Sequence, residues 1–337
     1  MTAGAGQILL KSAALVPQGR TVLAGCGPLL WLLAWQLLNA GVPIAALLDT
    51  TPAQNRRTAV RHAAQFIASP YLAKGLRLLL AVRRKTRVVS DVVELRADGA
   101  GRVETVSYRR RNGGEQKLDV DTLLLHQGVV PNVNLAMSIG VAHRWDDRQL
   151  CFVPVLDGSG DTNISGIAIA GDGAGIAGAE AAPLRGELAA LAAIRALRPD
   201  ALHGLPDASS LRARLRRATR GRAFLDTLYR PAEQFRRPSG ETIACRCEEV
   251  TARQVVDTVA LGCTGPNQMK AFLRCGMGPC QGRLCGLTVT ELIAQARNVT
   301  PEEVGHYRIR PPVKPITLGE LAQLPKTEQA LRSVARS

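Results

Sequence analysis

Aromatic residues are scarce in this sequence of 337 residues, at 4% of the total. No aromatic-interleaved RNA motif and no DNA-recognition helix accompany the formal net charge of +15. Most of the positive charge is arginine spread along the chain, and only residues 211–237 are dense, with nine arginines. We interpret this stretch as a solvated basic linker, so no nucleic acid is expected as a partner. An acidic protein partner or nucleic acid is the alternative.

A secretion signal and a long apolar run are also absent. Residues 1–6 have neither the basic start nor the apolar core of a signal peptide. The longest apolar run, residues 29–38, is too short to span a bilayer, so no transmembrane segment is predicted. We therefore expect a cytoplasmic protein with reduced cysteines, or one held at the membrane periphery through a larger complex.

Histidine is missing where the cysteines gather. Six of the eight cysteines lie within residues 245–285, and four of them form a frame without histidine: Cys245 and Cys247, then Cys280 and Cys285. Four thiolates without a nitrogen ligand suit an iron–sulfur cluster. Zinc is the alternative, although zinc sites more often use pairs separated by two residues. The five histidines of the chain are scattered, so no catalytic residue is assigned.

Two further cysteines, Cys263 and Cys275, lie inside this frame. Spacing alone does not choose between them and the frame, because Cys275 precedes Cys280 by the same interval that separates Cys280 from Cys285. The latter two flank the predicted start of a helix, whose amides stabilise thiolates. We therefore predict Cys245, Cys247, Cys280 and Cys285 as metal ligands, with Cys263 and Cys275 as buried small hydrophobic residues.

The N-terminal half begins with a strand–helix–strand pattern. A strand at 21–24 leads into a turn with Gly25 and Gly27, a helix runs to about residue 39, and a strand at 43–48 ends at Asp49. Such a glycine turn lets the backbone approach a pyrophosphate, and the acidic residue can accept a ribose hydroxyl. We thus predict an adenine-nucleotide site here. The alternative is the same fold without nucleotide binding.

The residues that follow predict one long helix at 53–80 and strands at 87–93, 102–111, 117–120 and 121–126. Farther along, an apolar strand delivers Gly171, Asp172 and Gly173 to a turn. We expect a helix at 174–197 to point its N-terminus at a ligand there, with Asp172 accepting from a polyol or ribose. The alternative is an aspartate that only caps the helix.

The C-terminal part alternates polar segments and short helices. Helices are predicted at 248–261, 265–274 and 281–296. Both the arginine-rich stretch at 211–237 and the proline-containing stretch at 306–315 look too polar to form a core. We expect them to dock on a partner subunit or to fold back on the preceding half-domain.

Together these motifs resemble a known family. The segments that carry the resemblance are residues 25–30, 123–132, 167–182, 245–251, 274–285 and 308–315. They are similar to the FAD-binding A subunits of opine oxidases, to which subunits of hydrogen cyanide synthase and of multimeric proline dehydrogenases are related. The resemblance covers nearly the whole chain, and the cysteine segment is its most specific part.

The resemblance implies an α/β fold, with glutathione-reductase-like dinucleotide-binding domains followed by a small, all-α module like bacterioferritin-associated ferredoxin. It divides the chain into a connector (1–20), an NAD-like domain (21–122), the C-terminal half of an FAD domain (123–200), a basic linker (201–240), a [2Fe-2S] module (241–304) and a tail (305–337). Family members begin with a first FAD motif that this sequence lacks. We expect an N-terminal truncation and weak FAD binding by this chain alone.

The resemblance also implies a function. The chain would be an electron-transfer subunit of an amino-acid or opine dehydrogenase complex, with a [2Fe-2S] cluster on the four cysteines and FAD held through Asp172. An amino-acid-oxidase-like flavoprotein β subunit would oxidise the C–N bond, and the sequence identifies no electron acceptor. The alternatives are a non-enzymatic [2Fe-2S] or nucleotide-binding module and a zinc-bearing nucleic-acid binder.

Overall fold

The computed structural model describes residues 1–324, 327–329 and 332. Its N-terminal part is built on a parallel sheet of four strands in the order β3-β2-β1-β7. The strands are β1 (Thr21–Gly25), β2 (Ile44–Asp49), β3 (Val88–Val89) and β7 (Thr122–His126). All five residues of β1 are buried, as expected of a central strand in a sheet covered on both faces.

Helices and a second sheet cover the two faces. On one face α2 (Pro28–Asn39) packs its leucines against the sheet. On the other face lies an antiparallel sheet of β4 (Val92–Asp98), β5 (Thr105–Arg110) and β6 (Glu115–Asp119), with the fully buried Tyr108 in the shared core. The strand–helix–strand pattern read from the sequence is therefore confirmed, and its ends shift by only one or two residues.

The predicted long helix at 53–80 is wrong. The chain instead forms α3 (Ala53–Ala59), a 3-10 turn (Val60–His62), α4 (Ala63–Ile67) and α5 (Tyr71–Lys85). Pro70 immediately precedes α5 and cannot donate a backbone hydrogen bond, so a continuous helix is excluded at this point. The break turns α5 back along α2, with which it packs.

The N-terminal residues continue the sheet. The Met1 amine donates to the carbonyl of Leu123, and Thr2 forms a parallel bridge with Leu125. The helix α1 (Ala3–Ala13) then crosses β7, with Gly6 against the Leu124 side chain. The segment predicted as a connector therefore contains a helix that packs on the parallel sheet.

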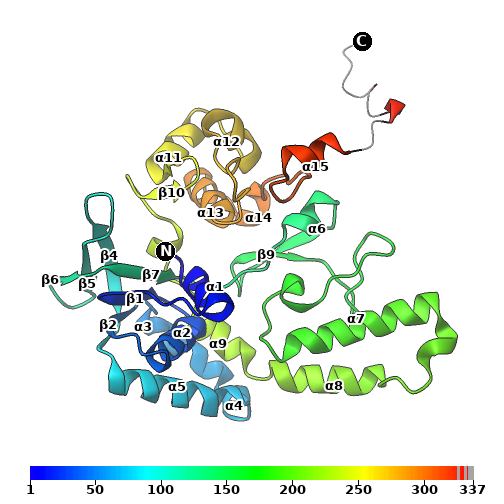
Figure 1. Ribbon diagram of the computed structural model, residues 1–337, viewed down its shortest axis with the longest axis horizontal. Coiled ribbons are helices and arrows are strands. Elements are labelled where there is room, and N and C mark those ends of the chain that lie inside the picture. Colours follow the sequence, from blue (N-terminus) through cyan, green and yellow to red (C-terminus); the bar gives the residue numbers. More distant parts are fainter. Residues whose placement is uncertain (325–326, 330–331, 333–337) are drawn as a thin grey trace.

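A second group of elements follows β7. It comprises α6 (Asn134–Ser138), β8 (His143–Asp146), β9 (Cys151–Pro154), a 3-10 turn η2 (Gly171–Ala174), α7 (Ala181–Leu197), the 3-10 turn η3 (Pro199–Leu202) and α8 (Ala208–Thr219). The two long helices α7 and α8 lie side by side at the lower right of Figure 1. Their contact is a small apolar cluster that includes Leu184, Leu188 and Leu211.

The arginine-rich stretch is folded and makes contacts within this chain. Besides α8, it forms α9 (Arg222–Leu228) and α10 (Glu233–Arg236). The Phe224 ring of α9 stacks on Phe66 with centroids 4.1 Å apart. Arg236 and Arg237 both pair with the buried Glu291. The packing of α8 on α7 agrees with the predicted return to the preceding half-domain, but α9 and α10 pack elsewhere.

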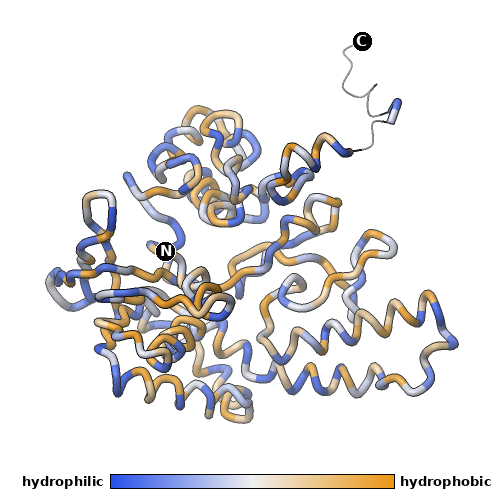
Figure 2. The backbone as a smooth tube through the Cα atoms, viewed as in Figure 1, coloured by the Kyte–Doolittle hydropathy of each residue, from blue (hydrophilic) through white to orange (hydrophobic). Residues whose placement is uncertain are grey.

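The cysteine-rich module lies at the top of Figure 1. Its elements are β10 (Ile243–Cys245), β11 (Val250–Thr251), α11 (Ala252–Ala260), α12 (Pro266–Leu273), α13 (Gly286–Arg297) and α14 (Pro301–Val304). Figure 2 shows the alternation of apolar and polar residues along these helices. The chain ends its described part beyond α15 (Leu318–Ala322). Within the residues that the structure describes, no helix has both the length and the apolar character needed to cross a bilayer.

The predicted polar tail is partly core. Tyr307 is 1% exposed and Ile309 is buried beside it in the module's own apolar cluster. The Gln281 amide donates to the carbonyl of Pro312, and the Lys270 ammonium donates to that of Arg308. Residues 306–313 thus close the module. The His306 ring also meets the Phe152 ring of β9 edge to face, with centroids 5.6 Å apart, so this segment contacts the predicted FAD half-domain as well. Docking on a partner subunit stays a prediction.

Candidate metal centre

The first cysteine pair is placed by a short hairpin. Cys245 ends β10 and pairs with Val250 of β11, which brings the intervening loop and Cys247 to one end of the hairpin. The next residue, Thr251, caps α11 in a reciprocal arrangement with Gln254. This capping box fixes where the helix begins and therefore fixes the hairpin that carries the two thiols.

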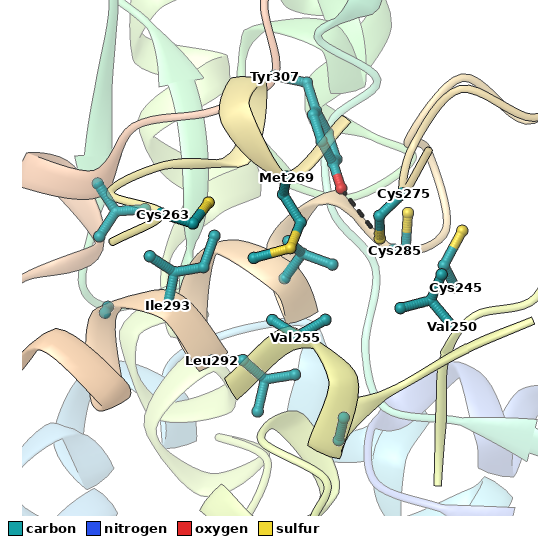
Figure 3. Packing of buried hydrophobic residues seen from close by; sticks show 14 of the residues in the cluster. Cys245, Val250, Val255, Cys263, Met269, Cys275, Cys285, Leu292, Ile293 and Tyr307 are labelled. Carbon is teal, nitrogen blue, oxygen red and sulfur yellow. Dashed lines mark hydrogen bonds between the residues drawn. The ribbon is translucent and has the colours of Figure 1, made fainter. Parts of the chain in front are cut away.

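Three thiols from distant parts of the module meet in its interior. The Sγ atoms of Cys245, Cys275 and Cys285 all lie within 4.8 Å of one another, and the three residues are buried. Figure 3 shows the three side chains next to one another, with the hydroxyl of Tyr307 pointing at Cys275. That hydroxyl donates to the Cys275 Sγ at 3.4 Å. The prediction treated Cys275 as a buried small residue outside the ligand set, but the structure places its thiol within this group.

Cys247 and Cys280 form a second pair beside this group, and both are partly exposed. A hydrogen bond from the backbone N–H of Cys280 stabilises the Cys247 thiolate and lowers its pKa. The hydrogen bond between the two thiols and partial burial raise it by more, so the pKa of Cys247 is raised on balance. Electrostatic repulsion from Cys245 also raises this pKa. Of the four predicted ligands, the structure brings Cys245 and Cys285 into the buried group, with Cys275 as its third thiol, and it pairs Cys247 with Cys280.

The hydrogen bonds among the buried thiols favour one thiolate. The hydrogen bond from Cys285 has the largest effect and lowers the pKa of Cys275. Hydrogen bonds from Tyr307 and Cys245 lower it further, and although burial acts in the opposite direction, the pKa falls to about 7. Its partner Cys285 has a raised pKa because it donates to Cys275 and because it is buried. The pKa of Tyr307 is raised mainly by burial and then by the neighbouring thiols. Cys275 is thus more readily ionised than its partner Cys285.

The Tyr307 ring packs closely against the loops that carry the cysteines. A Cβ atom on Gly276 would lie 2.5 Å from the Tyr307 ring, and one on Gly282 would lie 2.7 Å from it. Both glycines have positive φ angles, +86° and +77°, which other residues rarely adopt. These two glycines therefore allow the loops that carry Cys275, Cys280 and Cys285 to close around an aromatic side chain.

The donor set fits an iron–sulfur cluster. All candidate ligand atoms are sulfur, they come from two loops, and an apolar core lies around the buried three. Cys263 lies apart, on the far side of Met269 in Figure 3, and its thiol donates to the carbonyl of Gly265. Its predicted role as a buried small residue agrees with this position. Cys151 is buried at the start of β9.

The Asp172 turn is built differently from the prediction. The expected helix at 174–197 is wrong at its start, since η2 ends at Ala174 and α7 begins only at Ala181. Arg185 of α7 donates to the carbonyls of Gly171 and Gly175 and so braces the turn. Asp172 is exposed, and among the described residues none hydrogen-bonds its carboxylate. The turn, with Gly173 behind the aspartate, fits a hydroxyl-bearing ligand, but the α7 N-terminus does not follow it directly.

The predicted nucleotide residues lie at the carboxyl edge of the parallel sheet. Gly25 and Gly27 lie against β7, since a Cβ on Gly25 would fall 1.6 Å from the carbonyl oxygen of His126, and one on Gly27 would fall 3.2 Å from its Nε2 atom. Both glycines are therefore required by the protein's own packing. Asp49 is 6% exposed and accepts from the Thr51 backbone N–H at 3.0 Å. Burial raises its pKa.

Several residues at these sites carried no sequence signal. Tyr307 and the Arg236–Glu291 ion pair follow no motif, because their roles depend on contacts across 32 and 55 positions. A signal did exist for Cys275, namely its equal spacing to Cys280, but the preference for a helix N-terminus outweighed it.

Comparison with known proteins agrees with this geometry. Residues 241–324 match the sarcosine oxidase A3 domain. The chain is 50% identical to the A subunits of opine oxidase from Rhizobium meliloti and from Agrobacterium tumefaciens, over 99% of its own length and 64% and 67% of theirs. The chain thus spans about two thirds of the length of these curated relatives.

More distant relatives extend the match. The chain is 30% identical to a hydrogen cyanide synthase subunit of Pseudomonas aeruginosa, over 96% of this chain and 71% of that one. Among solved structures, L-proline dehydrogenase from P. horikoshii superposes with a TM-score of 0.61 at 18% identity, covering 94% of this chain and 53% of that one. This last likeness is one of fold and agrees with the α/β dinucleotide-binding architecture. On these identities and coverages, the chain belongs to the family of opine oxidase A subunits.

Proposed function

We propose that this chain is the iron–sulfur subunit of a complex that oxidises an opine or amino acid. The observation that carries the proposal is the group of sulfur donors gathered in one module of a chain from the opine oxidase A family. When bound, a [2Fe-2S] cluster would accept and release single electrons. The ligands that we propose remain Cys245, Cys247, Cys280 and Cys285.

The chain's own residues would hold this cluster and shield it. Tyr307 fills the space behind the loops, and the apolar core excludes water from the buried thiols. The Tyr307 hydroxyl donates to a sulfur atom, and hydrogen bonds to sulfur are among the factors that set a cluster's reduction potential. The protein would thus contribute positioning and potential tuning, with no acid–base group of its own.

FAD, an adenine nucleotide and a partner complete the proposal. The exposed Asp172 on its braced turn would accept a hydroxyl of the FAD ribityl chain, as in the family it resembles. The turn at Gly25 and Gly27, with Asp49, would be an adenine-nucleotide site. An amino-acid-oxidase-like flavoprotein β subunit would oxidise the C–N bond, in keeping with relatives that are named as subunits. The domain division given above stays part of this proposal.

Purification without oxygen tests the proposal. We expect visible absorbance bands of a [2Fe-2S] cluster, a rhombic electron paramagnetic resonance signal after reduction, and iron and acid-labile sulfide near two per chain. A colourless protein with one zinc per chain would contradict the proposal and favour the zinc-bearing alternative. Cluster bands in a chain that never co-purifies with a flavoprotein subunit would favour the non-enzymatic module.

A further inference from the structure

The carboxyl edge of the parallel sheet is covered by the chain's own connector. Three hydrogen bonds hold residues 228–230 there. The Asn55 amide, on α3, donates to the carbonyls of Leu228 and Arg230 at 3.0 and 2.8 Å. The Cys26 thiol, in the glycine turn, donates to the carbonyl of Tyr229 at 3.2 Å. Residues 228–230 are therefore hydrogen-bonded to the glycine turn and lie at the strand end where a nucleotide would bind.

Tyr229 lies over the acidic residue of the predicted site. Its side chain is only partly exposed, packs against the α2 core, and interacts electrostatically with Asp49 and Cys26 beneath it. Arg56 and Arg83 stand near both Asp49 and Tyr229. An aromatic side chain and two arginines therefore lie near the acidic residue of the proposed nucleotide site, at the carboxyl ends of the parallel strands where this kind of fold binds its ligands.

One buried polar atom at this edge is not matched by the protein itself. The Nε2 atom of His126, in a residue 7% exposed, has no hydrogen-bond partner among the described residues. It stands by Gly27, the residue that caps the N-terminus of the twelve-residue helix α2. Burying a polar atom without a partner is costly, so it indicates a ligand that the segment replaces. Asp49 differs, because its buried carboxylate accepts from the Thr51 backbone N–H.

We propose that residues 228–230 act as a built-in lid, with Tyr229 occupying the adenosine space, so that an adenine nucleotide binds only when this segment is displaced. The inference rests on the nucleotide site proposed above and is independent of the cluster. The lid is suited to exchange, because neutral hydrogen bonds and a partly exposed ring hold it, while the residues beneath it are buried. The positive charges of Arg56 and Arg83 would favour a phosphorylated competitor.

Titration calorimetry of the full chain with ADP tests this proposal. We expect Tyr229→Ala to bind ADP at least about tenfold more tightly than the wild type, because the variant no longer has to displace the ring. Tyr229→Phe keeps the ring and should bind like the wild type. Asn55→Ala removes two of the segment's hydrogen bonds and should shift the affinity in the same direction as Tyr229→Ala. It also serves as the test should Tyr229→Ala fail to fold.

A second measurement follows the segment itself. In the wild type, saturating ADP should increase backbone hydrogen exchange in residues 222–230 and leave that of α13 unchanged. Adding Asp49→Asn to Tyr229→Ala should lose most of the gained affinity. Equal ADP affinity in the wild type and Tyr229→Ala would overturn the lid, as would no binding by either or unchanged binding after loss of Asp49. Cluster absorbance, read on the same samples, reports separately on the proposed function.

Discussion

Short sequence motifs predicted both the cysteine module and the nucleotide site at the edge of the parallel sheet, but the surrounding chain packs differently around the two. In the module, thiols from distant loops converge and the surrounding chain closes behind them. At the sheet edge, the glycine turn and Asp49 are present, but His126 and Tyr229 already occupy the space around them. A motif therefore indicates which ligand a segment could bind, while tertiary packing decides whether that site is accessible.

The largest expected effect is the loss of the cluster when one of the buried thiols proposed as its ligands is replaced. Cys245→Ser or Cys285→Ser should remove nearly all cluster absorbance and iron, because an oxygen ligand at a buried iron is a poor replacement for a thiolate. Cys263→Ser is the matched control, since this residue is equally buried but lies apart. Iron content that survives in Cys285→Ser and disappears in Cys263→Ser would show the ligand set to be wrong.

Cys275→Ser sharpens the same point, because its thiol lies within the buried group although we do not propose it as a ligand. We expect the cluster to be retained, with a shifted spectrum or potential from the changed hydrogen bonding near the sulfur atoms. Loss of iron equal to that in Cys245→Ser would instead make Cys275 one of the ligands.

Removal of the Tyr307 ring should destabilise the fold of the cysteine module. Tyr307→Ala leaves a cavity between two loops and should cost about 3–5 kcal/mol in the free energy of unfolding. Tyr307→Phe keeps the ring and loses only the hydroxyl, for about 1 kcal/mol. Denaturant titration of both variants gives the comparison. Equal stability of Tyr307→Ala and the wild type would mean that the ring contributes nothing.

The ion pair between Arg236 and Glu291 links the two regions, because the connector that covers the sheet edge also reaches α13. Glu291 is 3% exposed, so Glu291→Gln should leave two arginines facing a neutral side chain and lower the unfolding free energy by about 3 kcal/mol. The exposed Glu233, which also lies near Arg237, provides the control, and Glu233→Gln should change stability by less than about 1 kcal/mol.

The smallest effect is a pH dependence at the sheet edge. Burial lowers the pKa of His126 from 6.5 to about 4. The folded state therefore binds this proton less readily than the unfolded state, and stability falls as the pH falls below 6.5 toward about 4. One such histidine accounts for about 2 kcal/mol between about pH 7 and about pH 5. His126→Gln should make the decline shallower by that amount, and an unchanged slope would exclude this histidine as its source.

Local patterning predicted much of the fold, and tertiary contacts explain the rest. The strand–helix–strand start was predictable because short apolar runs separated by a glycine turn and by Gly41 mark buried strands and a buried helix within a short window. The break at Pro70 was visible in the sequence, but helical periodicity on both sides hid it. At the sites, the grouping of cysteines in residues 245–285 was visible in the sequence, but their spacing did not separate Cys275 from Cys285. The parts that escaped prediction, Tyr307 and Tyr229, act through neighbours that are remote in sequence.

The position of Tyr307 also sets an order of events during synthesis. This residue emerges from the ribosome after Cys285, and the backbone groups that fasten its segment, at Arg308 and Pro312, emerge later still. Until then the cysteine loops have no aromatic side chain to close upon, although every thiol has already been made. If the proposed cluster binds here, the thiols would therefore be enclosed only after residues 307–312 have been translated, and loading with metal would be a late step in the life of the nascent chain.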